Sequence, residues 1–130
     1  MKQIKTLEPG GVFEEEGVYV TAVPAYNNDK PFHPRENDWL GYVLTIDEVT
    51  IYHTGDSDLI PEMKEIECNI ALLPVSGTYV MTAEEAAKAT DIIEPDVCIP
   101  MHWGNLIGTE EDAHKLKKLA KCKTVILEKE

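Results

Sequence analysis

The sequence predicts a single α/β domain over residues 1–130, built on one mixed β-sheet. Short apolar runs of strand length recur along the chain, and patterns typical of helix starts separate the later runs. The 130 residues are enough for one hydrophobic core, and an apolar fraction of 43% with a charged fraction of 28% is typical of globular proteins. Neither an internal repeat nor a linker-like stretch divides the sequence, which favours one domain.

The first half of the chain has the pattern of β-strands. Strands are expected over residues 18–23, 40–46 and 49–52. Pro24 ends the first of them, and the Asp47-Glu48 pair between the other two is typical of a hairpin turn. Residues 27–38 are a polar stretch with two prolines, long enough to be a functional loop. Residues 1–9 carry only weak structural signals.

The second half of the chain alternates strands with helices. Helices are expected over residues 61–67, 83–93 and 110–120, and strands over residues 70–75, 97–100 and 124–127. Pro61 suits the first turn of a helix, and Thr82 with Glu85 has the spacing of a capping box. Thr109 precedes a segment that is acidic at its start and lysine-rich at its end, as the helix dipole prefers.

The expected sheet has too few helices to cover both of its faces. Its strands over residues 40–46, 70–75 and 97–100 are apolar enough to be buried on both sides, whereas the three helices can cover one. An open apolar face would exceed the size, roughly a few hundred Å², that soluble monomers usually expose. We therefore expect a homodimer in which this sheet face packs against a second copy of the chain.

The net charge of −12 restricts the classes of partner. Twelve basic against twenty-four acidic side chains repel phosphate backbones and anionic lipids, so we expect neither nucleic-acid nor membrane binding. A cytoplasmic protein is predicted, because no run of eighteen apolar residues and no basic-then-apolar leader occurs. Cys68, Cys98 and Cys122 are odd in number and widely spaced, which predicts reduced structural thiols.

Carboxylate and imidazole side chains stand at the ends of two expected strands. Asp56 lies in a Gly-Asp-Ser turn after an apolar run, with His53 three residues before it, and His102 follows the strand over residues 97–100. These are ligand types of hydrolytic Zn, Mn or Fe sites. Three protein ligands are the usual minimum, and no His-x-His-x-Asp-His cluster occurs, so the residues resemble half of a metal site. On the residues alone, a turn-forming aspartate and a partly buried structural histidine remain the commoner roles.

Seven motifs, in order along nearly the whole chain, resemble the metallo-β-lactamase superfamily and, within it, the branch of ascorbate-6-phosphate lactonase-like metal-dependent hydrolases. The motifs are Val23-Pro24-Ala25-Tyr26-Asn27, Phe32-His33-Pro34, Gly41-Tyr42, Ile51-Tyr52-His53-Thr54-Gly55-Asp56-Ser57-Asp58, Ala71-Leu72-Leu73-Pro74-Val75-Ser76-Gly77, Met81-Thr82-Ala83-Glu84-Glu85-Ala86 and Ile99-Pro100-Met101-His102-Trp103-Gly104. The resemblance implies the carboxyl-terminal half of a four-layer αββα sandwich, with one mixed sheet and helices on one face. In a complete member of that superfamily, the amino-terminal half supplies the His-x-His-x-Asp-His ligands.

The resemblance also implies roles for individual residues. Asp56 matches the aspartate that bridges two metal ions, which makes it both a metal ligand and a catalytic residue, and His102 matches the last histidine ligand. Asn27 falls where many relatives have a histidine ligand, and its amide oxygen favours a harder ion such as Mn²⁺ or Mg²⁺ over Zn²⁺. His53 is expected to be catalytic, as a neighbour of the ligands or a contact to substrate, and His33 to face the substrate.

The implied activity is hydrolysis of a small-molecule ester, lactone or phosphoester, with Zn or Mn ions that lower the pKa of a bridging water. The isolated chain is expected to be inactive, because the first ligand cluster of the superfamily is missing from its sequence. Three alternatives remain. The chain joins a separate chain that carries the amino-terminal half, it is a non-catalytic dimerising structural or binding module, or it is a truncated form of an ordinary hydrolase. Tyr79 stays open between a pocket wall and ordinary packing.

Overall fold

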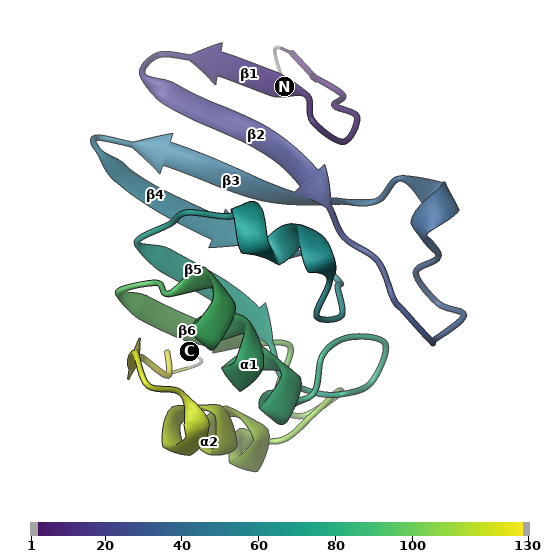
Figure 1. The fold of residues 1–130 in the computed structure, drawn as a ribbon, viewed down its shortest axis with the longest axis vertical. Coiled ribbons are helices and arrows are strands. Elements are labelled where there is room, and N and C mark those ends of the chain that lie inside the picture. Colours follow the sequence, from purple (N-terminus) through teal and green to yellow (C-terminus); the bar gives the residue numbers. More distant parts are fainter. Residues whose placement is uncertain (1–2, 129–130) are drawn as a thin grey trace.

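The computed structural model describes residues 3–128, which fold around one seven-stranded sheet (Figure 1). The strands are β1 (Val12–Glu15), β2 (Val18–Pro24), β3 (Leu40–Ile46), β4 (Val49–His53), β5 (Ile70–Pro74), β6 (Val97–Met101) and β7 (Lys123–Thr124). The helices are α1 (Ala83–Ile93) and α2 (Glu110–Leu119), with short 3-10 turns η1 (Arg35–Asn37) and η2 (Pro61–Glu65). Neither α-helix of the described part has the length and apolar character needed to cross a membrane.

The strands lie in the sheet in their sequence order, and the sheet is mixed, as predicted. Strands β1 to β4 are antiparallel neighbours, whereas β4 to β7 are parallel neighbours. Consequently β2, β4, β5 and β6 all run in the same direction. Their carboxyl ends meet at one edge of the sheet, and the loops that follow these four strands are brought together there.

All the helices that pack on the sheet lie on one face, in front of β4 to β6 in the view of Figure 1. The core between the helices and the sheet includes Tyr52, Met63, Leu73, Cys98 and Leu116, all fully buried. Helix α1 contributes mainly alanines, which let it approach the sheet closely. The prediction of helices on one face of one mixed sheet is confirmed.

The local signals for turns and helix starts are confirmed as well. Asp47 and Glu48 both have left-handed backbone angles, as a two-residue type I′ hairpin turn requires. The Thr82 hydroxyl accepts a hydrogen bond from the Glu85 N–H, and the Thr82 N–H donates to the Glu85 carboxylate. Thr109 and Asp112 form the same reciprocal cap on α2.

One strand was missed, and two expected boundaries were wrong. Strand β1 was not expected, because its acidic residues do not resemble a buried strand; charges suit an edge strand, where they oppose pairing with another chain. Turn η2 is shorter than the helix expected over residues 61–67, since Ile66 is already extended. The last strand stops at Thr124, because Pro100 of β6 has no N–H to continue the ladder after Val125 bonds to Cys98.

The opposite face of the sheet is apolar and carries no helix within residues 3–128. The strand register places on it Val20, Tyr42, Leu44, Ile46, Val49, Ile51, Ile70, Leu72, Val97 and Ile99. We call these residues the open face. Tyr42, Ile46 and Val49 are exposed, and the others are half-buried. Ordinary half-exposed sheets carry polar side chains at such positions.

The three thiols are free, as expected. Burial raises the pKa of Cys68 to about 11 and that of Cys98 to about 12. Both thiols therefore stay protonated near neutral pH, which suits a structural role and not a reactive one.

Candidate metal centre

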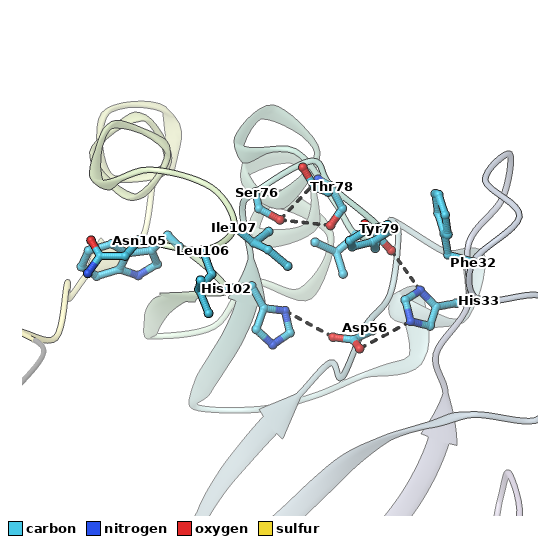
Figure 2. A pocket seen from close by; sticks show the side chains of 12 residues that line it. Phe32, His33, Asp56, Ser76, Thr78, Tyr79, His102, Asn105, Leu106 and Ile107 are labelled. Carbon is cyan, nitrogen blue, oxygen red and sulfur yellow. Dashed lines mark hydrogen bonds and ion pairs between the residues drawn. The ribbon is translucent and has the colours of Figure 1, made fainter.

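Four loops at the carboxyl edge of the sheet converge on one site (Figure 2). The loop after β2 brings His33, the turn after β4 brings Asp56, the loop after β5 brings Tyr79, and the loop after β6 brings His102. The crevice outside the carboxyl ends of strands is where α/β sheets commonly bind ligands. In this chain the convergence of the loops places His33 and His102, which are far apart in sequence, on two sides of the Asp56 carboxylate.

Asp56 lies between two imidazoles. Its Oδ1 atom is 3.3 Å from Nδ1 of His102, and its Oδ2 atom is 3.5 Å from Nε2 of His33. The turn that presents Asp56 depends on Gly55, whose φ is +65°. A Cβ at Gly55 would lie 2.6 Å from the backbone oxygen of Leu40, so only glycine fits without displacing the neighbouring strand.

The His33 ring is held in one tautomer by two acceptors. Its Nδ1 atom is 3.1 Å from the carbonyl oxygen of Tyr79 and 3.2 Å from the side-chain oxygen of Asn27. Because both partners accept, Nδ1 carries the proton, and the lone pair of Nε2 points toward Asp56. A backbone carbonyl that fixes the second ring nitrogen is the usual support of a metal-binding histidine.

Asn27 lies behind His33 and is buried. Its side-chain oxygen accepts the His33 N–H at 3.0 Å, and its Nδ2 donates to Asp58 at 3.1 Å and to the Tyr79 carbonyl at 2.8 Å. The structure thus brings together Asp56 and His102 of the predicted ligands, adds His33, and places the Asn27 amide in contact with His33. The role of Asn27 as a direct ligand stays a prediction.

Asp58 anchors the His33 loop to the turn that carries Asp56. Its buried carboxylate bonds to Lys30 Nζ at 2.7 Å and accepts the Asn28 N–H at 3.0 Å. Burial disfavours the charge of Lys30, but the hydrogen bond to Asp58 and the negative charges of Asp58, Glu85 and Asp29 together outweigh it and raise the pKa of Lys30. These contacts of Asp58 with Lys30 and Asn28 tie the His33 loop to the turn that carries Asp56.

Comparison with known proteins identifies the family. The model of the Beta-lactamase superfamily domain matches residues 1–102. A UPF0173 metal-dependent hydrolase of Methanopyrus kandleri is 36% identical over 126 residues, which are 91% of this chain and 55% of that protein. This chain belongs to the metallo-β-lactamase superfamily. It spans about half the length of the curated relatives it matches.

Solved structures agree with this assignment to the superfamily. A crystal structure assigned as a metal-dependent hydrolase of Parabacteroides distasonis superposes with a TM-score of 0.86 at 35% identity, over 98% of this chain and 59% of that one. A metallo hydrolase of Ignicoccus hospitalis gives a TM-score of 0.74 at 27% identity, over 94% of this chain and 56% of that one. The α/β fold is therefore the metallo-β-lactamase fold, as the sequence motifs implied.

His53 lies beside the same centre but presents its ring differently. Burial lowers the pKa of His53, and the neighbouring His102 lowers it further. The Gly55 N–H donates to Nδ1 of His53 at 3.1 Å, so the neutral ring carries its proton on Nε2. His53 also lines a cavity of about 420 Å³ together with Asp56 and His102. It can therefore donate a hydrogen bond to a water or substrate in this superfamily site.

Two residues of the centre have a strained backbone conformation. Tyr79 and His102 have φ values of 67° and 57°, a left-handed conformation that costs a residue with a bulky side chain of the order of 1–3 kcal/mol. Sequence reasoning left the role of Tyr79 open. Its carbonyl orients Asn27 and His33, and its ring lines the cavity beside them. No sequence pattern marks such a role, because the backbone oxygen of Tyr79, and not its side chain, orients Asn27 and His33.

The donor atoms at this centre form part of a ligand set for a divalent ion. Within residues 3–128, no group of three or more His, Cys, Asp or Glu side chains is placed to hold a metal alone. However, the lone pair of His33 Nε2 faces a carboxylate oxygen, which is repulsive unless a proton or cation lies between them. The separations from Asp56 to His33 and His102, 3.5 and 3.3 Å, resemble the spacing of about 3.4 Å between two ligands of a tetrahedral ion.

Proposed function

We propose that this chain forms one wall of a dinuclear hydrolytic centre, in which Asp56 would be shared by two divalent ions, His33 would hold one and His102 would hold the other. The single observation that carries the proposal is the Asp56 carboxylate between two imidazoles, one oxygen directed to each. The remaining ligands come from outside residues 3–128, because this part of the chain holds no complete set. The isolated chain is accordingly expected to show negligible turnover.

Two divalent ions at this centre would lower the pKa of a water and polarise the scissile bond of the substrate. The protein's own residues would orient the reactants. Asp56 would accept a hydrogen bond from the attacking water, and the Nε2–H of His53 would donate to the substrate oxygen that becomes negative. Asn27 and Tyr79 keep the His33 ring in its binding orientation. Ester, lactone and phosphoester substrates fit this mechanism, including those of the lactonase-like branch.

Zn²⁺ and Mn²⁺ are the proposed ions, because two imidazoles and one carboxylate suit both. In this proposal Asn27 acts as a positioning residue. If Asn27 were instead a direct ligand, its amide oxygen would have to release the two contacts that it makes with His33.

Metal uptake by single variants tests the centre. Isothermal titration with Zn²⁺ or Mn²⁺ should give weak binding to the wild type and a loss of heat for His33→Ala and for His102→Ala. His114→Ala is the matched control, because His114 lies exposed on α2 and pairs there with Glu110, away from the metal centre. Equal heats for all four proteins would show that His33 and His102 are not ligands. Robust turnover of the chain alone, abolished by Asp56→Ala, would overturn the expected inactivity.

A second candidate function, a dimerising module without turnover, is favoured by the open face. We propose that this face binds a second copy of the chain in an isologous contact. Its central residues Leu44, Ile51 and Leu72 carry no charge, so two copies can meet without burying ions. Burial of an apolar surface contributes about 25 cal/mol per Å², although ordering costs offset much of this.

The charge of −12 on each copy opposes the dimer, so salt should strengthen it. Sedimentation equilibrium at low and moderate salt should show a dimer that tightens as salt is added. A monomer at both salts would overturn the second copy as occupant, and a separate chain that carries the other half of the fold would then be sought. We also propose a cytoplasmic location, which the three free thiols support.

A further inference from the structure

The metal centre opens into a larger cavity of about 950 Å³ (Figure 2). Asp56, His33 and His102 line one side of it. Its other walls are mainly apolar, with Phe32 and Tyr79 next to His33, and Leu106 and Ile107 next to His102. A volume of this size suits a small molecule, since ligand sites commonly enclose roughly 300–1,000 Å³.

The apolar walls are unusually exposed. Leu106 is 99% exposed, Phe32 49%, and Tyr79 and Ile107 40% each. The rings of Phe32 and Tyr79 pack edge to face, with centroids 4.4 Å apart, so they form one preformed aromatic surface. Exposed apolar side chains grouped around a polar centre mark a ligand site, and scattered ones do not.

Outside the metal centre, the described walls of the cavity carry no permanently cationic side chain. No lysine or arginine of the described residues lines it. The two cations of the His33 loop are already paired, Lys30 with Asp58 at 2.7 Å and Arg35 with Glu62 at 3.2 Å. Phosphate groups are usually bound by free cations or by open helix N-termini.

The N-termini of both α-helices are also unavailable to an anion. The side chain of Glu85 accepts the Thr82 N–H at the start of α1, and the side chain of Asp112 accepts the Thr109 N–H at the start of α2. Each helix start thus already holds a carboxylate of its own, which repels a second anion. Together with the net charge of −12, this favours a neutral ligand over a phosphorylated one.

We propose that this cavity takes a small neutral substrate with an aromatic or branched apolar group, held between Phe32–Tyr79 and Leu106–Ile107, with its hydrolysable carbonyl bond directed to Asp56. This substrate class rests on the proposed hydrolytic function. It selects neutral esters and lactones from the three possible classes and disfavours phosphoesters. Leu106 and Phe32 are the residues that set the specificity, because they are exposed and contribute apolar surface alone.

Binding without metal separates this inference from the metal centre. N-benzylacetamide, a neutral uncleaved probe, and phenyl phosphate are titrated into the full chain in the presence of a chelator, and binding is followed by isothermal titration and NMR. The neutral probe should bind at least about tenfold more tightly than phenyl phosphate. Leu106→Ala and Phe32→Ala should each weaken it about three- to tenfold, as expected for losing about one or two buried methylene equivalents.

Two controls decide where the probe binds. Val49→Ala removes a similarly exposed apolar side chain from the open face and should leave probe binding unchanged. The chelator is the second control: because the probe titrations contain no free metal ion, failure of the metal proposal leaves them unchanged and is distinguishable. Equal or tighter binding of phenyl phosphate, or no effect of both Leu106→Ala and Phe32→Ala, would overturn the inference.

Discussion

Leu72 and Leu73 are neighbours on β5, yet they lie on opposite faces of the sheet and in different environments. Leu73 is fully buried beneath α1 and η2, and Leu72 lies on the open face beside Ile99 and His53. Successive residues of a strand point to opposite faces, so these two adjacent leucines allow a direct comparison of the two sides of the sheet. Within residues 3–128, the helices cover one of the two sheet faces and leave the other without a cover.

The β3–β4 hairpin shows that the open face is not a by-product of a uniformly apolar sequence. Its hydroxyl-bearing pair, Thr45 and Thr50, lies on the helix side, with their oxygens 3.0 Å apart. Its apolar pair, Ile46 and Val49, lies on the open face and is exposed. In an ordinary one-sided sheet the polarity of these two pairs would be reversed. The hairpin is therefore patterned for burial on the side that the helices do not reach.

The largest expected contrast is in stability. Leu73→Ala should lower the free energy of unfolding by about 2–5 kcal/mol, because it leaves a cavity beneath α1. Leu72→Ala should cost less than about half of that in the monomer, since its side chain is partly hydrated already. Urea titration at low protein concentration measures both. Equal losses would mean that the open face is covered in solution.

The second contrast concerns association. Ile46→Lys places a charge on the open face at an exposed position, so it should weaken self-association by a factor of about ten or more while the monomer stays folded. Lys88→Glu would make the net charge more negative, so it is unsuitable as a control. Ile92→Lys is the matched control, because Ile92 is an exposed isoleucine on α1. Sedimentation equilibrium of both variants is the measurement. Association that Ile92→Lys weakens as strongly would locate the contact on the helix side.

A smaller effect on stability is expected from the start of α1, a helix that packs on the covered face of the sheet. Thr82→Ala removes the hydroxyl that accepts the Glu85 N–H and should cost about 1 kcal/mol of stability. Thr109→Ala removes the corresponding cap of α2 and should cost a similar amount. Thermal unfolding of the two variants tests this. A loss as large as that of Leu73→Ala would show that Thr82 also supports the loop next to the cavity.

Much of the fold was predictable from local signals. The capping boxes, the two-residue hairpin turn and the buried strands are encoded within a few residues, and the structure confirms them. The limits of β7 depend on a proline in a different strand, and the edge strand β1 depends on pairing with β2. Such non-local causes leave no pattern in the segment itself.

The site was predictable only in part for the same reason. Asp56 and His102 stand at strand ends, where their positions at the carboxyl edge follow from the order of the elements. His33 lies within a long loop, and its approach to Asp56 depends on the buried pair of Lys30 and Asp58. A loop of this length has many possible paths, so no spacing rule places its side chain.

The smallest expected effect is a pH dependence of the folding stability that arises from His53, next to the metal centre. Burial lowers the pKa of His53 in the folded state, so between the unfolded value of about 6.5 and the folded value only the unfolded chain binds the proton. The unfolded state then binds more protons, and stability must fall as pH decreases through that window. His53→Gln keeps an oxygen that can accept the Gly55 N–H but does not titrate. Urea titrations at pH 7.5 and at about pH 5.5 should show a larger loss for the wild type than for His53→Gln. An equal loss would assign the pH dependence to other groups, and a gain at low pH would mean that His53 is stabilised as the cation by Asp56.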